Sequence, residues 1–552
     1  MILTLLGLFA SMSGAWAAVN LPVHHWAYDE LERLAVIGLI DRAMLSTKPF
    51  SRTAAAKLVA KAIRKIESGR VAEGLATAEV EQALADLRDE FQEELIALGV
   101  EPARETPGMP PLANLPTMRF RFADPLRVEI FGADINSKTP APPPTGGHAD
   151  FRQPGFRKNF RGESFRDGLN VQSELRTWAE VGDHFGLSFN PKFIHSDHSD
   201  QLQVKELYGK FTVSNIDLLV GRDSMWWGPG SSATILMTDN ARSFDLLKIG
   251  SVEPFRLPWV FRPLGDFTAT MFATKLRGND GNPKFVGTRI GWMPASWFEF
   301  GANRMIIFGK EGQGTRFQDF WRGFFRVKSS GANSTDDFRT KSDELITMDF
   351  RMLVPLWEAL SFGKTMQIYG ELGGEEGGTY FLEGIFFQTG VFIPGFIWPG
   401  TDLRIEYSNS QSLDNPIQPF SDYNHHIFTS GYRFQGNMIG HNMGSNADAI
   451  FVRLTQHLTP TRRLNLELEQ QRHGIKNCVP GAVLPNSDIV CPAALLPVGE
   501  KERTVTLGLT EIISPRLRFE PVFSLQRLTK EGGVEGLNDT NWYFGASMSF
   551  RY

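Results

Sequence analysis

Two tryptophans and several hydrogen-bonding side chains lie close together in the segment 221–256. Trp226 and Trp227 precede a Gly-Pro-Gly turn and offer flat apolar faces with N–H donors at their rims. The polar side chains of the segment supply donors and acceptors, and they are Arg222, Asp239, Asn240, Arg242 and Asp245. Sugar rings have apolar C–H faces and hydroxyl edges, so the segment predicts a carbohydrate-binding surface. The alternative is that the tryptophans fill space inside the fold while the polar groups bond to backbone.

Arg222 stands at the end of an apolar, strand-like run and is followed by Asp223. A guanidinium in this place can anchor the segment through an ion pair. It can also present a two-pronged donor to an acidic sugar. Both roles can hold at once.

A second polar and aromatic segment covers residues 423–444. Its side chains could hydrogen-bond to a polymer and stack against it, and the candidates are Tyr423, His425, Tyr432, Arg433 and His441. Together with His426, the two histidines of that set suggest a metal, but no carboxylate or thiol stands at a recognised ligand spacing. We therefore expect a structural or sugar-facing role here, with no metal and no cofactor.

Asp239, Asp245 and Glu253 could supply the carboxylate pair of a glycosidase, which keeps a hydrolase as an alternative. The sequence contains no nucleophile elbow, metal-binding helix or phosphate loop. It predicts a protein that is not an enzyme. Cys478 and Cys491 are the only cysteines, and in an exported chain they most simply form a disulfide that closes a loop.

The elements that must position these groups are strands. A chain of 552 residues has room for a barrel and a small extra domain, and its 53 glycines indicate many turns. From Met118 onward, segments of about ten residues alternate between apolar and polar side chains, which is typical of a transmembrane barrel. The last segment, Asn541–Tyr552, places aromatic and apolar residues on one face: Trp542, Phe544, Ala546, Met548 and Phe550. The formal net charge of −5 gives no support for nucleic-acid binding.

The direction of each strand follows from placing the carboxyl end in the periplasm. Short turns then fall on the periplasmic side, at 263–265, 293–295, 356–360, 393–400, 458–460 and 513–516. Long connections fall at the extracellular mouth, at 136–167, 223–256, 411–445 and 471–502. The count closes at about eighteen antiparallel strands if 321–325 and 425–434 are loop. Long loops of this kind are expected to fold inward and plug the barrel.

The chain before the barrel divides into three parts. Residues 1–17 predict a signal peptide, with an apolar core and Ala15-Trp16-Ala17 as a cleavage site. Residues 18–100 predict three amphipathic helices that share a small core and lie in the periplasm under the barrel, with Ser51 capping the second. Residues 101–117 are a proline-rich linker, and 118–552 form the barrel.

The runs RDSMWWGPG, ILMTDNARSFDLLKI and SVEPFRLPW, in this order, resemble the signature of the Wzi family of outer-membrane capsule assembly proteins. The segments LERLAVIGLIDRAMLSTKPFSR and YNHHIFTSGYRFQGNMIGHNMG are also similar to that family. The resemblance implies an eighteen-stranded barrel in the outer membrane of a Gram-negative cell. It further implies a lectin-like attachment point for capsular polysaccharide or exopolysaccharide, surrounded by outer-membrane lipid.

The helical part also resembles an S-layer homology motif, a module that can hold cell-wall polymer. HHWAYDELERLAVIGLIDR and PFSRTAAAKLVAKAI carry the likeness, but Thr53-Ala54 stand where that motif has a small residue followed by Glu. The helical part is therefore a candidate contact for peptidoglycan or for periplasmic export machinery. A porin tethered to the wall is the alternative function, and channel conductance separates it from a lectin.

Overall fold

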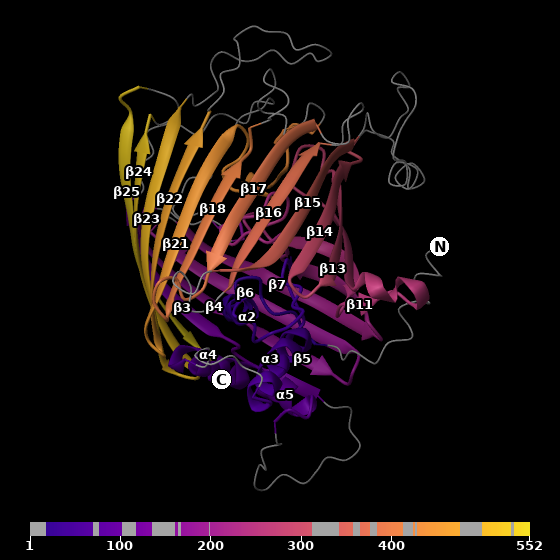
Figure 1. Ribbon diagram of the computed structural model, residues 1–552. Helices are drawn as coiled ribbons and strands as arrows, with labels where there is room; N and C mark the ends of the chain where they lie inside the picture. Colours follow the sequence, from indigo (N-terminus) through magenta and orange to yellow (C-terminus); the bar gives the residue numbers. More distant parts are fainter. Residues whose placement is uncertain are drawn as a thin grey trace.

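The chain forms a closed β-barrel with a group of helices at one end (Figure 1). The computed structural model describes residues 18–69, 77–101, 118–134, 161–163, 167–197, 199–311, 342–356, 365–375, 383–411, 423–424, 428–474, 499–530 and 535–551. The predicted signal peptide, nearly all of the predicted linker, the stretch 321–325, His425 and both cysteines lie outside these residues. In the part that is described, no helix is long and apolar enough to span a bilayer.

Eighteen antiparallel wall strands are found among the described residues, which confirms the predicted fold class and strand number. In chain order they are β3 (Leu126–Asp134), β4 (Gly168–Leu175) continued by β5 (Thr177–Val181), β6 (Phe185–Ser196), β7 (Ser199–Val213), β8 (Ile216–Asp223), β10 (Phe244–Ser251), β12 (Asp266–Lys275), β13 (Lys284–Ala295), β14 (Phe298–Phe308), β15 (Ser342–Pro355), β16 (Thr365–Glu375), β17 (Glu383–Ile393), β18 (Thr401–Asn409), β21 (Ala447–Thr459), β22 (Arg462–His473), β23 (Glu500–Ser514), β24 (Leu517–Thr529) and β25 (Asn538–Phe550). Two short pieces extend the wall, β2 (Met118–Arg121) beside β5 and β11 (Phe255–Arg256) beside β12. The cylinder closes where β25 pairs with β3.

The two faces of each wall strand differ as the alternation predicts. In β25, Trp542, Phe544, Met548 and Phe550 are exposed on the outside, whereas Tyr543 is buried inside the barrel. Neighbouring strands add further exposed apolar side chains, among them Leu525, Phe523 and Leu507. An outward apolar band of this kind suits the hydrocarbon region of a membrane.

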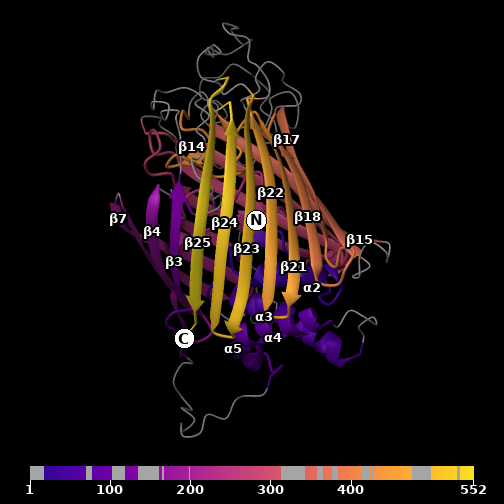
Figure 2. The same ribbon diagram turned by 90° about the vertical axis from the view of Figure 1, so that its left-hand side faces the viewer.

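The end of the barrel that carries the helices, together with the last residues of β25, is called the head end here (Figure 2). Each predicted short turn overlaps a connection between strands that meet at this end, with one exception. Met293–Ala295 still belong to β13, and a register shift between Trp292 and Ala295 moves the turn to residues 296–297. The stretch 425–434 contains no wall strand among its described residues, since β19 (Arg433–Phe434) pairs only with β20 (Asn437–Met438).

The helical head contains α2 (Ala27–Val36), α3 (Arg52–Glu67), α4 (Ala78–Glu90) and α5 (Gln92–Ala97). Ser51 caps α3 as predicted, because its side chain accepts a hydrogen bond of 3.1 Å from the backbone N–H of Ala54. The third predicted helix is two helices that meet at Phe91. Their apolar faces enclose one small core, which includes Leu31, Leu34, Val59, Ile63, Leu84, Leu87, Phe91 and Leu95.

The head does not only lie beneath the barrel, since its first part bonds to inward-facing residues of the wall. Arg404 of β18 donates to Glu32 at 2.7 Å, and Arg33 lies 3.0 Å from Asp402. Farther along, Leu45 and Ser46 donate their backbone N–H groups to Glu299 of β14, each at 3.1 Å. The prediction of a head packed under the barrel was therefore incomplete, because several residues between 18 and 48 bond to inward-facing residues of the wall.

Arg52 links the head to the wall at a fully buried position. Its guanidinium lies 2.7 Å from Glu94 and 2.8 Å from Glu90, both in the head. On the wall side it lies 3.5 Å from Asp124, and its charge faces the ring of Trp178 at 5.3 Å. Three buried carboxylates therefore share Arg52 as a common cation, which makes this contact sensitive to substitution.

The same contact predicts that acid loosens the head. Burial opposes ionisation of Glu90, but Arg551, His25 and Arg52 outweigh it and hold the Glu90 pKa well below 4.5. Burial lowers the pKa of His25 below its usual 6.5, although Glu90 opposes this. Both pKa values are lower in the folded head than in the unfolded head, so the unfolded head binds more protons. The folded head therefore loses stability as pH falls, first below about 6.5 and more steeply below about 4.5. We expect protease cleavage within 18–101 to increase between about pH 7 and pH 4, while the barrel stays intact.

Candidate functional site

Two segments fold into the barrel and fill part of it; together, residues 224–243 and 428–446 are called the plug here. Their backbones meet where Thr238 donates to the carbonyl of Ile439 at 2.9 Å. Tyr423 and Tyr432 donate their hydroxyls to the carbonyls of Ile235 and Leu236, at 2.7 and 2.8 Å. The two aromatic segments identified from the sequence therefore pack together as one unit.

Side chains of the wall hold the plug through its backbone. Glu406 of β18 accepts the N–H groups of Ser231 and Ser232 at 2.7 and 2.9 Å. Glu371 of β16 accepts the N–H of Ile235 at 2.8 Å. Buried carboxylates that receive backbone donors in this way satisfy polar groups that would otherwise be lost to water.

Two glycines allow the close approach of these segments. A Cβ at Gly440 would lie 1.9 Å from the carbonyl oxygen of Ile235, and a Cβ at Gly230 would lie 1.9 Å from that of Ala233. Neither distance is sterically possible. The WGPG turn and the Ile-Gly-His run are therefore packing requirements of the plug.

The tryptophan pair is buried, with 3% of Trp226 and 1% of Trp227 exposed. As β9 (Trp226–Trp227), the pair forms a small antiparallel sheet with β1 (Thr47–Lys48) of the head. Trp227 packs edge-on against Phe272 at 5.4 Å, and Trp226 donates its indole N–H to Gly230. The expected exposed stacking face is thus covered, and the geometry matches the alternative of tryptophans that fill space.

Most of the other predicted contact residues are also buried in the plug. Asn240 donates to the carbonyl of Met438 at 3.1 Å, and Arg433 donates to Asn424 at 3.1 Å. His441 accepts the N–H of Met443 through Nδ1 at 3.2 Å. Arg242 differs, because it is partly exposed and donates to Gln435 at 3.0 Å.

Arg222 and Asp245 lie on the outer face of the barrel wall. They are cross-strand partners on β8 and β10, on the same face as the exposed Val220 and Leu247. The guanidinium forms a two-pronged pair with Asp245 at 2.8 and 2.9 Å. The pair joins the two wall strands that flank the first plug segment, and it does not connect the plug itself to the wall.

Loss of this pair is expected to have a small effect. Arg222→Gln and Asp245→Asn should each change the free energy of unfolding by at most about 1 kcal/mol, because exposed ion pairs contribute little. Polymer retention should not change, since neither side chain reaches the bore. Thermal unfolding in detergent and an assay of cell-bound polymer check both expectations. A large loss of retention in either variant would contradict this placement.

The three carboxylates that could have formed a glycosidase pair lie in three different places. Asp239 is buried in the plug and forms an ion pair with His24. Asp245 lies on the outside of the wall, and Glu253 lies at the head end beside Lys57. The expected position of 223–256 at the mouth is therefore wrong for residues 244–256, which return along β10 to the head end. These groups do not form the paired carboxylates that glycoside hydrolysis requires.

The plug fills only one side of the bore. Its apolar side chains pack against inward-facing residues of β7, β8, β10, β12–β15 and β17. The shared core includes Met225, Trp227, Ile235, Leu236, Met237, Leu246, Phe272, Phe285, Met305, Ile307, Leu345 and Phe386. This side of the bore is closed by apolar packing.

The opposite side of the bore contains a polar chamber of two adjacent cavities, about 500 and 280 Å³ in volume. Both cavities are lined by His24, Arg453, Asn465, Glu467, Thr510 and Glu520. The larger one reaches Ser231 of the plug, and the smaller one reaches Trp26 of the head. Charged and neutral donors and acceptors therefore face both cavities.

The chamber's side chains are held in place by one another. Arg453 donates to Glu467 at 2.7 Å and to Ser231 of the plug at 3.2 Å. Thr455 donates to Asn465 at 2.8 Å. Such an array suits a hydroxyl-rich ligand, because it offers both senses of hydrogen bond at fixed positions.

The chamber was not predicted from the sequence, although a signal was present. The inward positions of β22 and β23 are polar, with Asn465, Glu467, Thr504 and Thr506 as examples, whereas those of β10 and β14 include the apolar Phe244, Leu246, Met305 and Ile307. Comparing the inward faces around the ring would have separated the plugged side from the polar side.

The comparisons with known proteins agree with this architecture. The model of the capsule assembly protein Wzi family matches residues 142–540. An uncharacterized 55.8 kDa protein in the cps region of Klebsiella pneumoniae is 26% identical over 190 residues, which is 33% of this chain. The matched part spans only 35% of that relative.

A solved structure of Wzi from Escherichia coli superposes with a TM-score of 0.65 at 16% identity, covering 97% of this chain and 100% of that one. That protein is described as an outer-membrane protein involved in group 1 capsule assembly and as a carbohydrate-binding β-barrel. The barrel, its plug and the matched family model lead to one conclusion: the chain belongs to the Wzi family of capsule assembly proteins and is an outer-membrane β-barrel.

Proposed function

We propose that this protein holds exported polysaccharide, capsular or of a related kind, at the cell surface without cleaving it. The observation that carries the proposal is the polar chamber beside the plug, in a barrel of the capsule assembly family. Arg242, which is partly exposed on the plug, is a further contact for the polymer. The buried residues of the plug act by keeping these groups in place. A polymer engages several such weak sites at once.

The head is proposed to face the periplasm, where it is available to peptidoglycan or to export machinery. Its position at the end of the barrel that carries the carboxyl-terminal strand supports this orientation. The outer surface of α4 and α5 is acidic, with Glu79, Glu81, Asp89 and Glu93 at least partly exposed.

Deletion of the protein tests the proposal directly. Cells that lack it should release polymer into the medium, while the total amount of polymer stays the same. Measuring cell-bound against shed polymer checks this. Equal partition in deleted and unmodified cells would remove the proposed function.

A large side chain in the chamber should also reduce polymer retention, in a protein that still folds. Thr506 lines the chamber, whereas the next residue, Leu507, faces outward and is exposed. We expect Thr506→Trp to lower the affinity for polymer by about tenfold or more through lost hydrogen bonds. Leu507→Trp is the matched control and should leave binding unchanged. Equal binding by both variants would place the polymer outside the chamber.

A diffusion porin is the second candidate, because the chamber extends from Trp26 of the head to Ser231 of the plug. A porin would give a wide and steady current in planar bilayers. A holding protein would give little current.

A further inference from the structure

A short 3-10 helix, η1 (Trp259–Leu264), stands out from the barrel wall between β11 and β12 (Figure 1). Its side chains are unusually exposed for their type, with 89% of Trp259, 82% of Val260 and 54% of Phe261 accessible. A large apolar surface of this kind on a protein's exterior marks a site of interaction.

The position of η1 is fixed by the wall. Trp292 of β13 donates its indole N–H to the carbonyl of Leu264 at 2.6 Å and stacks on Phe267 of β12. Gly265 then turns the chain with φ +98°, and a Cβ there would lie 2.2 Å from the carbonyl oxygen of Met293. The exposed face of η1 is therefore held in a fixed position by contacts with the wall.

Cationic side chains outnumber carboxylates beside η1. Asp266 accepts from Arg42 and from Arg256, each at 2.6 Å. Lys61 of α3 donates to the backbone carbonyls of Arg42 and Asp41, at 3.3 and 3.4 Å, and its charged neighbours are Asp266, Glu253 and Asp41. Arg262 is exposed on η1 itself, and no carboxylate is recorded beside it among the described residues. An excess of positive charge remains at this place.

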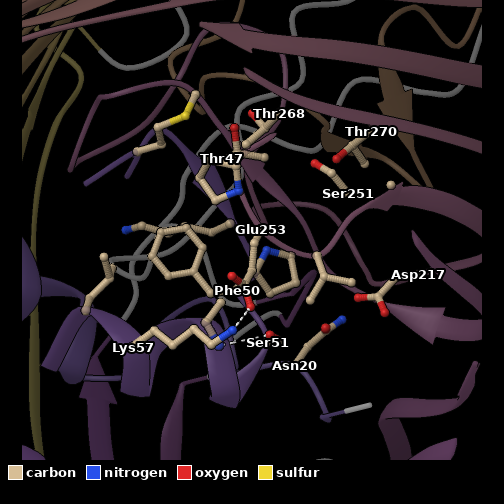
Figure 3. A pocket seen from close by; sticks show the side chains of 18 of the residues that line it. Asn20, Thr47, Phe50, Ser51, Lys57, Asp217, Ser251, Glu253, Thr268 and Thr270 are labelled. Carbon is tan, nitrogen blue, oxygen red and sulfur yellow. Dashed lines mark hydrogen bonds and ion pairs between the residues drawn. The ribbon is translucent and has the colours of Figure 1, made fainter. Parts of the chain in front are cut away.

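The neighbouring lysines of α3 do not share this excess. Figure 3 shows Lys57 directed at Glu253 across the cavity between α3 and the wall, and the two form an ion pair. Lys65 lies 2.9 Å from Asp41. Unmatched charge is therefore concentrated next to the exposed apolar helix.

The outer wall beside η1 continues the apolar band of the barrel. Val220, Leu247, Ile249 and Ile290 are exposed there, on β8, β10 and β13. Since this band lies in the outer membrane, η1 lies at its head-side margin. Aromatic side chains with adjacent arginine and lysine are typical of the level at which lipid headgroups begin.

We propose that η1, with Arg42, Lys61, Arg256 and Arg262, is a binding site for the headgroups of anionic phospholipids in the leaflet on the head side. Trp259 and Phe261 insert at the boundary between headgroups and acyl chains, and the cations bind the phosphate. Because Arg42 and Lys61 belong to the head while η1 belongs to the wall, one lipid cluster contacts both parts.

Native mass spectrometry of the full chain in detergent tests this with phosphatidylglycerol and phosphatidylethanolamine at equal concentration. The unsubstituted chain should retain phosphatidylglycerol about tenfold more, and Lys61→Gln with Arg262→Gln should remove the preference. Lys65→Gln is the matched control and should keep it. Trp259→Ala should reduce retention of both lipids, whereas Trp297→Ala, at another exposed tryptophan, should not.

Several results would overturn the proposal. One is equal retention of the two lipids by the unsubstituted chain, and another is an unchanged preference in the doubly substituted chain. Full competition by inorganic phosphate would show that the cations bind a free anion instead of a lipid. A dimer that Trp259→Ala converts to a monomer, with lipid retention unchanged, would make η1 an interface between copies of the chain.

Discussion

Arg52→Met is expected to release the head from the barrel. The substitution keeps a side chain of similar length but leaves Glu90, Glu94 and Asp124 buried without their common cation. Removing one partner of a buried ion pair destabilises by about 3–5 kcal/mol, since the remaining charges stay in a medium of low polarity. Protease cleavage within 18–101 should rise in a barrel that still resists heat and detergent.

Arg64→Met provides the matched control for this substitution. Arg64 lies on the same helix, but its side chain is exposed, so the effect should stay within about 0.5 kcal/mol. If Arg52→Met leaves the head as resistant to protease as Arg64→Met does, the buried cluster does not hold the head in place.

Gly440→Val is expected to separate the two halves of the plug. The first added carbon would already lie 1.9 Å from the carbonyl oxygen of Ile235. The conflict is between backbone and side chain, so no rotation relieves it. The bonds from Tyr423 to Ile235 and from Thr238 to Ile439 should be lost. Overpacking of this kind costs about 1–3 kcal/mol or more, and single-channel conductance should rise as the bore opens.

Gly508→Val is the control for that experiment. Gly508 lies on β23 and lines the polar chamber, but a Cβ there meets nothing within 4 Å. It adds the same volume to the bore without displacing the plug. Equal conductance of the two variants would mean that contact between the plug segments does not close the barrel.

The barrel could be predicted from sequence because its signal is local. Alternation in segments such as Asn541–Tyr552 reports directly on which side chains face the membrane. Fixing one end of the last strand then sets the direction of all the others. The turn at 293–295 was misplaced, since a register shift in β13 leaves no mark in the alternation.

The site was harder to predict, because its contacts join residues that are distant in the chain. The sequence marks Trp226 and Trp227 as important residues, but their burial depends on pairing with β1 of the head. Arg222 and Asp245 could have been placed outside the barrel, since each stands two residues from an outward-facing apolar side chain, Val220 and Leu247. The disulfide, the absence of a metal and the polymer contacts stay predictions.

The pairing of Thr47–Lys48 with Trp226–Trp227 has a consequence for biogenesis. The ribosome makes the first partner long before the second, and both must cross the inner membrane before they meet. During that interval Thr47–Lys48 have no partner strand with which to form backbone hydrogen bonds. A periplasmic chaperone would have to shield it. The barrel must then close around its own amino-terminal segment, because β1 pairs with β9 inside it.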